Sequence, residues 1–210
     1  MTISPIATQT HSFLESLKIV TNNFSFKDQI YIITDIPWSQ YEAITEYFAN
    51  QSHYRTSYLE GTIQIMSPGK NHEVIKKRIA NLLEAYFQEK EIDYYPLASN
   101  TLKLEPKQAG KEADESYCIK TEKEFPDLAV EVVFASGGIN SLEIYKRLQV
   151  REVWFWQNEN LKMYSLSDND YIEVTSSQVL PDLDIELLVK YISQPNLRLA
   201  IKEFRAELQK

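Results

Sequence analysis

One carboxylate, Glu131, interrupts one of the most apolar stretches of the 210-residue chain. It stands between Leu128-Ala129-Val130 and Val132-Val133-Phe134. A strand this apolar is normally buried in the centre of a sheet, where a lone carboxylate is costly unless it is paired or bound to a metal. Two interpretations follow. Glu131 either binds a metal in a catalytic site or forms an ion pair with a buried arginine or lysine.

Asp114 is the second carboxylate whose position suggests chemistry, and it has acidic neighbours on both sides. It falls in a predicted strand at residues 112–119, which can lie beside the predicted strand at residues 127–134. Asp114 and Glu131 would then point into one pocket. Because two converging carboxylates repel each other, we expect a divalent cation between them, and hard oxygen ligands suit Mg²⁺ or Mn²⁺. The sequence therefore predicts a metal site at Asp114 and Glu131.

His72 is the third candidate, and it begins the helix that precedes these strands. A histidine there can bind a metal, hold a phosphate or orient a water, although helix capping or packing explains it more simply. His11 and His53 lie in less patterned surroundings and receive no role. One cysteine and three scattered histidines do not make a zinc site. The chain also lacks the G-x-S-x-G nucleophile turn and the spacing of a phosphate loop.

Hydrophobic spacing predicts the elements that must position these residues. Ser39 caps a helix that ends near residue 49, Glu60-Gly61 forms the turn of a hairpin, and Asn71 caps a second helix that runs to about residue 90. The order predicts an α/β (α+β) protein with a mixed central sheet flanked by helices and an N-terminal helix–hairpin extension. The other predicted elements are strands at 100–105, 112–119 and 127–134, a helix at 140–149, a strand at 152–156, a hairpin at 162–166 and 171–175, and two C-terminal helices.

The composition favours a soluble protein with one main domain. Hydrophobic residues make up 43% of the chain, which is enough for a sizeable core. The single cysteine, Cys118, excludes an internal disulfide and indicates a reducing compartment, which we predict to be the cytoplasm. No apolar run approaches the roughly 20 residues of a membrane span, and no signal-peptide pattern is present. The net charge of −8 opposes binding to phosphates, although it does not fix the local charge of a site.

A set of short motifs, taken in their order and spacing, resembles a known family. No single motif is specific, but together they cover roughly residues 35–192 and resemble the Uma-two family of restriction-endonuclease-like proteins, which is assigned to the PD-(D/E)XK nuclease superfamily. The motifs are Met66-Ser67-Pro68, His72, Glu112-Ala113-Asp114-Glu115-Ser116-Tyr117, Pro126-Asp127-Leu128-Ala129-Val130-Glu131-Val132, Ser136-Gly137-Gly138-Ile139-Asn140, Leu142-Glu143-Ile144-Tyr145, Val150-Arg151-Glu152-Val153-Trp154-Phe155-Trp156 and Leu180-Pro181-Asp182-Leu183-Asp184.

The resemblance implies a restriction-endonuclease-like fold and a metal-dependent DNA endonuclease that hydrolyses phosphodiester bonds. The aspartate of the family's second core strand falls on Asp114, the glutamate of its third strand on Glu131, and its helix-start histidine on His72. In nucleases of this fold the carboxylates hold Mg²⁺, which polarises the scissile phosphate and helps to generate the attacking hydroxide. The resemblance thus implies DNA and Mg²⁺ or Mn²⁺ as partners, and a homodimer, which is common for this fold.

The chain departs from the family at the expected lysine. The position two residues after the glutamate is Val133, and the position four residues before Tyr145 is Ser141. Lys146 is expected to face elsewhere, because five residues turn a helix about 140° beyond a full turn. Lys103 could reach the site if its side chain points inward. Loss of the lysine would weaken stabilisation of the transition-state charge, so the sequence leaves the activity of this chain open.

Two alternatives to an active endonuclease remain at this point. A catalytically inactive nuclease-fold module for binding or assembly would fit the missing lysine and the acidic balance. A structural pair of carboxylates tied to a buried arginine would place the function elsewhere. A lysine nitrogen within about 4 Å of the carboxylates would favour the enzyme, since it could act on a shared phosphate. The predicted organisation is an N-terminal extension at residues 1–34, an endonuclease-like domain at 35–192 and a C-terminal helix at 193–210.

Overall fold

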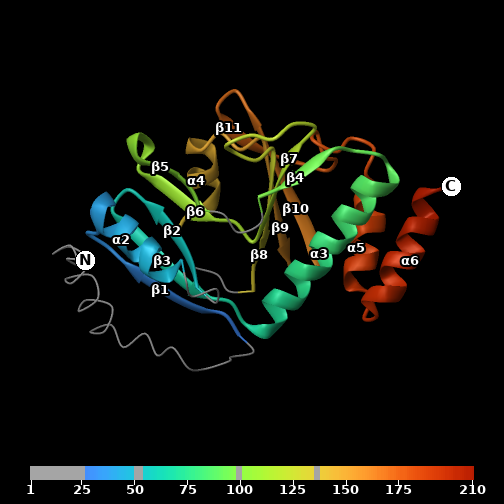
Figure 1. Cartoon of the computed structure of the whole chain (residues 1–210), viewed down its shortest axis with the longest axis horizontal. Coiled ribbons are helices and arrows are strands. Elements are labelled where there is room, and N and C mark those ends of the chain that lie inside the picture. Colours follow the sequence, from blue (N-terminus) through green and yellow to red (C-terminus); the bar gives the residue numbers. More distant parts are fainter. Residues whose placement is uncertain (1–26, 50–53, 98–100, 135–137) are drawn as a thin grey trace, which may run out of the picture.

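The computed structural model of the chain describes residues 27–49, 54–97, 101–134 and 138–210. Two β-sheets share a core, and helices cover their outer faces (Figure 1). The mixed α and β architecture confirms the predicted fold class, with two sheets where one was expected. Most of the predicted N-terminal extension, residues 1–26, lies outside the described residues, as do His11, His53, Ser136 and Gly137. None of the described helices is long and apolar enough to cross a membrane.

The first sheet has five strands in the order β1-β3-β2-β6-β5, and every neighbouring pair is antiparallel. One helix, α2 (Trp38–Phe48), packs on this sheet and closes a small aromatic core with it. The strands are β1 (Gln29–Ile33), β2 (Arg55–Leu59), β3 (Thr62–Ser67), β5 (Thr101–Leu104) and β6 (Ala109–Glu112). A short 3-10 helix at Glu105–Lys107 joins β5 to β6.

The second sheet has six strands in the order β11-β10-β9-β8-β7-β4. Its one parallel pair is β8 with β9, and the connection between them carries α4 (Ser141–Arg147). A layer of three helices, α3 (Lys70–Glu89), α5 (Ile185–Ser193) and α6 (Leu197–Leu208), covers one face of this sheet (Figure 1). The strands are β4 (Tyr94–Pro96), β7 (Glu115–Ile119), β8 (Leu128–Val132), β9 (Glu152–Gln157), β10 (Asn160–Ser167) and β11 (Asp170–Val174).

A third core fills the space between the two sheets beside α4. Ala109 comes from the first sheet, Ala129 and Val153 come from the second, and Ile144 and Tyr145 come from α4. All five side chains are fully buried. Small residues on the strands leave room for the α4 side chains, so α4 packs between the two sheets on one side of the molecule. The space that remains between the sheets beyond α4 is where the candidate site lies.

The hairpin and the main helices agree with the sequence patterns. Glu60 and Gly61 both have positive φ, at 45° and 81°, which is the geometry that a two-residue hairpin turn requires. The predicted apolar stripe of the second helix faces the core, where Ile79, Leu82 and Leu83 have no exposed surface. The hairpin β10–β11 and the two C-terminal helices also lie where the sequence places them.

Several boundaries differ from the prediction. The strand predicted at 112–119 is two strands, because β6 belongs to the first sheet and β7 to the second. Asp114 therefore lies in the link between them and not within a strand. The predicted caps are wrong: α3 begins at Lys70 after Gly69, and α2 begins at Trp38 after Pro37. The Pro37 carbonyl accepts from the Tyr41 N–H at 3.1 Å, so the first turn of α2 begins two residues earlier than a cap at Ser39 would place it. Strands β1 and β4 were not predicted.

Candidate active site between the two sheets

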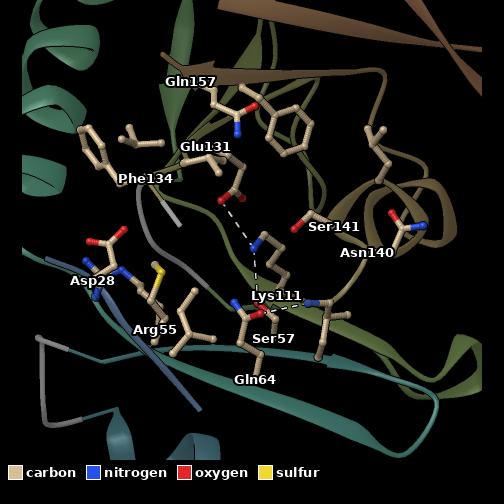
Figure 2. A pocket seen from close by; sticks show the side chains of 18 of the residues that line it. Asp28, Arg55, Ser57, Gln64, Lys111, Glu131, Phe134, Asn140, Ser141 and Gln157 are labelled. Carbon is tan, nitrogen blue, oxygen red and sulfur yellow. Dashed lines mark hydrogen bonds and ion pairs between the residues drawn. The ribbon is translucent and has the colours of Figure 1, made fainter. Parts of the chain in front are cut away.

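A cavity of about 320 Å³ lies between the two sheets (Figure 2). From the first sheet, β2, β3 and β6 supply Ser57, Gln64 and Lys111, and from the second sheet β8 and β9 supply Glu131 and Gln157. The first turn of α4 closes a further side. Because each wall belongs to a different sheet, residues far apart in the sequence meet here through the packing of whole sheets.

Glu131 and Lys111 point toward each other across this cavity (Figure 2). The Lys111 Nζ atom lies 3.4 Å from Glu131 Oε2 and donates to Ser57 Oγ at 3.3 Å. The Tyr145 hydroxyl, on α4, donates to the other carboxylate oxygen of Glu131. Lys111 and Glu131 are each only 5% exposed, yet both line the cavity. They therefore form a buried ion pair with one side turned toward an open space.

The electrostatics of Glu131 show a carboxylate that is costly to keep charged. Burial raises its pKa, Lys111 and Tyr145 oppose this effect, and the negative charge of Asp114 adds to it. The sum raises the pKa of Glu131 to about 7. Asp114 is thus close enough to disfavour the charged form of Glu131. A pair of this kind is stabilised by an additional cation.

Asp114 is held by the backbone of β8. Its Oδ2 atom accepts a hydrogen bond from the Val132 N–H at 2.8 Å, and Val132 follows Glu131 in β8. Its Oδ1 atom lies 2.9 Å from His72 Nε2, which is an ion-pair distance without the alignment of a hydrogen bond. Asp114 is 2% exposed. The link between the sheets thus fixes Asp114 directly beside the backbone that carries Glu131.

His72 bridges Asp114 and a third carboxylate, Asp28. The His72 Nδ1 atom lies 3.1 Å from Asp28 Oδ2, and Asp28 Oδ1 accepts from the Gly69 N–H at 2.8 Å. Burial would lower the pKa of His72, but the carboxylates of Asp114 and Asp28 outweigh it and raise this pKa to about 10. The ring is therefore a cation at neutral pH. Burial would likewise raise the pKa of Asp114, but His72, the Val132 N–H and Lys111 lower it below its usual value.

Replacing Asp28 with asparagine should lower the free energy of unfolding by about 1–3 kcal/mol, because it leaves the buried His72 cation with one partner in place of two. The asparagine oxygen can still accept from Gly69, so the change removes mainly the charge. Urea unfolding of both proteins measures the difference. The matched control is Glu42→Gln, which removes one partner of the exposed Lys103–Glu42 pair and should cost less than about 1 kcal/mol. Equal losses in the two variants would contradict the role given to Asp28.

The structure places the three residues predicted from the sequence in one connected group. Glu131 lines the cavity itself. Asp114 and His72 are buried next to it and reach it through Val132 and through Asp28, which both line the cavity. The sequence also left open an ion pair between Glu131 and a buried lysine. That pair exists, with Lys111, but it borders a cavity.

The structure corrects one of the two expectations about lysines, the one for Lys103. Lys103 does not reach the site: it lies on β5 and pairs with Glu42 of α2 at 3.1 Å. Alternation along β5 turns the neighbouring Leu102 into the shared core, so Lys103 faces the opposite side. Lys146 faces away, as expected, and pairs with Glu143 at 2.7 Å.

Sequence reasoning missed Lys111, and only a weak signal could have identified it. It stands three residues before Asp114, in the run Gly110-Lys111-Glu112, which has the composition of an exposed loop. Asp28 was missed as well, because the pattern of the first 30 residues is weak. Both positions become meaningful only when the two sheets face each other.

Charges around the cavity differ from those of the whole chain. Among the described residues that line it, three are basic, Arg55, Lys111 and Lys162, and three are acidic, Asp28, Glu112 and Glu131. The cavity is therefore close to balanced inside a chain with a net charge of −8. One divalent cation would make it positive. The net charge of the chain is thus not an obstacle to phosphate binding at this place.

The donors present fit a magnesium-type ion. Within the described part of the chain, no group of three or more His, Cys, Asp and Glu side chains converges as a ready metal cage. Mg²⁺ does not require one, because it keeps several waters and binds through one or two carboxylates together with substrate phosphates. Glu131 supplies a hard oxygen donor that faces the cavity, and Asp114, buried beside it, is a second one. Burial is the main cause of the raised pKa of Glu131, the negative charge of Asp114 adds to it, and a cation would offset both effects.

Comparison with known proteins identifies the family of the chain. A search of curated proteins finds no match. The sequence model of the Uma2 family, described as a putative restriction endonuclease, matches residues 38–199, which include His72, Lys111, Asp114 and Glu131. Asp28 lies before the matched region. The match covers more than half of the chain and agrees with a restriction-endonuclease-like fold and a nuclease-like function. The chain therefore belongs to the Uma2 family of restriction-endonuclease-like proteins.

Proposed function

We propose that the protein is a metal-dependent DNA endonuclease that hydrolyses phosphodiester bonds in the cavity between its two sheets. Asp114 and Glu131 would hold the metal, Mg²⁺ or Mn²⁺. Lys111 and Tyr145 are additional residues of the site, and His72 assists through its contact with Asp114. Homodimer formation and a cytoplasmic location stay predictions.

The observation that carries this proposal is the position of Lys111. Its ammonium lies 3.4 Å from the Glu131 carboxylate, close enough for both groups to act on one phosphate. Positions 133 and 141 lack the expected lysine, but Lys111 approaches the same carboxylate from the opposite sheet. The missing lysine and the acidic balance of the chain favour an inactive module, whereas the position of Lys111 supports an enzyme.

Each residue has a part that its contacts suggest. The metal, when bound, supplies a Lewis acid for the phosphate and a more acidic water. Lys111 presents a positive charge to the phosphate oxygens, where charge increases in the transition state. Tyr145 fixes the Glu131 carboxylate by donating to it, and His72 fixes Asp114 in turn. Hydrolysis adds a water oxygen to phosphorus and breaks one P–O bond, and a proton passes to the departing sugar oxygen.

Removing both carboxylates should abolish metal binding and DNA cleavage together. The variant is Asp114→Ala/Glu131→Ala, because two oxygen donors are the protein's share of a Mg²⁺ site. Calorimetry with Mn²⁺ measures binding, and gel analysis of plasmid DNA with Mg²⁺ measures cleavage. The control variant Glu42→Ala/Glu46→Ala removes two exposed carboxylates of α2 and should behave as the wild type.

Two results would count against the proposal. Unchanged cleavage in Glu131→Ala would remove this residue from the reaction. A wild-type protein that neither binds Mn²⁺ nor cleaves DNA would favour a nuclease-fold module used for binding or assembly.

A further inference from the structure

We propose that the substrate of this site is an unpaired DNA strand, so that single-stranded or locally opened DNA is cut and an intact double helix is not. The inference rests on the proposed endonuclease function and adds to it the form of DNA that the cavity accepts. Three features of the molecule support it: the burial of the reacting groups, the size of the cavity, and the side chains on its walls.

The groups proposed to act on the phosphate are not at the surface. Lys111 and Glu131 are each 5% exposed, and Asp114 is 2% exposed. They lie between two sheets, so the phosphate must enter the cavity to meet them (Figure 2). A double helix is stiff over many base pairs and carries its phosphates on a convex surface with stacked bases behind them. A single strand can bend its backbone sharply and bring one phosphate inward.

The cavity has the size of a site for one small molecule. Its volume of about 320 Å³ is at the lower end of the roughly 300–1,000 Å³ that small-molecule sites occupy. That space suits a single nucleotide and is too small for a base pair. Enzymes that work on one nucleotide inside such a pocket act on single strands or extrude the nucleotide from the duplex.

The cavity walls carry aromatic and basic side chains, the types that bind single-stranded DNA. Phe134 and Phe155 line the cavity, and Phe134 is 53% exposed, so a flat group can pack on its ring. Exposed aromatic rings with nearby positive charge are typical of sites where unpaired bases stack. Lys162, an exposed residue on the cavity wall, can bind a neighbouring phosphate, and Arg55, which lies 3.9 Å from Glu73, adds positive charge to the same wall.

Amide side chains complete the lining. Gln157 projects into the cavity from β9 and Gln64 from β3 (Figure 2). Gln64 Oε1 accepts from the Ile139 N–H at 3.0 Å, which leaves its amide nitrogen to donate. Amides can both donate and accept hydrogen bonds, as the edges of unpaired bases do. In a base pair these edges are already hydrogen-bonded to each other. The cavity therefore offers stacking, charge and hydrogen bonds to a nucleotide that has left its partner.

The test offers one end-labelled DNA strand to the full-length wild-type protein with Mg²⁺ in three forms. These are the strand alone, the strand in a full duplex, and the strand in a duplex with a central mismatched bubble. We expect cleavage of the free strand, and of the bubble within its unpaired part, at least about tenfold faster than cleavage of the duplex, as expected when stacking on the protein is possible only for unpaired bases. Duplex cleavage at an equal or higher rate would overturn the inference.

A surface variant tests the stacking contact separately. Phe134→Ala should weaken binding of the single strand about tenfold in fluorescence anisotropy, which is the size of one base–aromatic contact. The control is Tyr95→Ala, which removes another exposed aromatic ring, 40% exposed, on β4 at the far edge of the second sheet. Equal binding by the two variants would remove Phe134 from the site.

The two proposals fail in different ways. Cleavage of duplex DNA that depends on Glu131 would keep the endonuclease function and reject the unpaired substrate. Cleavage of single-stranded RNA in preference to DNA would also reject the DNA substrate. If none of the three forms is cut, the endonuclease function fails, and the inference that rests on it fails too.

Discussion

Replacing Lys111 with methionine should lower the rate of DNA cleavage by about 10²–10³-fold, the usual effect of removing one group that stabilises transition-state charge. Methionine keeps most of the length and volume of the side chain while it removes the ammonium. The buried Lys111 is the cation of the described residues that directly contacts the Glu131 carboxylate. Gel assays of DNA cleavage under single-turnover conditions measure the effect on the chemical step.

Metal binding in the same variant separates the role of Lys111 from that of the carboxylates. Lys111 repels a divalent cation, so Lys111→Met should bind Mn²⁺ at least as tightly as the wild type in calorimetry. The carboxylate double variant should lose both binding and cleavage. The matched control, Lys202→Met, removes an exposed lysine of α6 and should change neither property. Loss of metal binding in Lys111→Met would mean that the residue only supports the local structure.

A second-site change gives a sharper test of Lys111. Ser141 stands where the resemblance to the family predicts a lysine, and it lines the same cavity (Figure 2). Adding Ser141→Lys to Lys111→Met should recover about tenfold or more of the lost cleavage rate, because a charge returns to the cavity from the opposite wall. No recovery, together with unchanged metal binding, would mean that the position of Lys111 itself is required.

The sequence could predict that the Glu131 carboxylate is buried in a strand, but it could not predict which groups surround that carboxylate. Glu131 was selected because it interrupts an apolar strand, and the structure confirms that it is buried. Glu152 also begins an apolar strand, Glu152–Gln157, and is more deeply buried, with no exposed surface. The same pattern thus marks one carboxylate that faces a cavity and one that is enclosed by hydrogen-bond donors. Only the contacts of the fold distinguish them.

Residues that meet through long-range packing were the hardest to predict. Periodicity found most helices and strands, since each depends on its own spacing. It could not show that the chain changes sheets at Asp114, because β6 and β7 follow each other with only two residues between them. Without that change of sheet, Lys111 cannot face Glu131. Asp28 depends in the same way on β1 joining the first sheet next to β3.

Replacing Glu152 with alanine should lower the free energy of unfolding by about 3–5 kcal/mol, because it leaves several buried hydrogen-bond donors without an acceptor. Glu152 Oε1 accepts from Trp154 Nε1 at 2.5 Å, and Oε2 accepts from the backbone N–H groups of Gln178 at 2.7 Å and Val179 at 3.2 Å. The carboxylate therefore pins the segment before α5 to the second sheet. Urea unfolding, with the slope compared between variants, gives the loss.

Two further variants show that this loss belongs to the hydrogen bonds. Glu152→Gln keeps one acceptor oxygen and should cost less than alanine, about 1–3 kcal/mol. Glu159→Ala removes an exposed carboxylate from the nearby β9–β10 turn and should stay within about 0.5 kcal/mol of the wild type. A loss below about 1 kcal/mol in Glu152→Ala would mean that water satisfies these donors.

Glu152 does not line the cavity, so the folded fraction of Glu152→Ala should keep the wild-type cleavage rate, whereas Glu131→Ala should lose it. This contrast follows from one physical difference: the oxygens of Glu152 are enclosed by donors of the protein, and those of Glu131 border a space that a metal and a phosphate can enter.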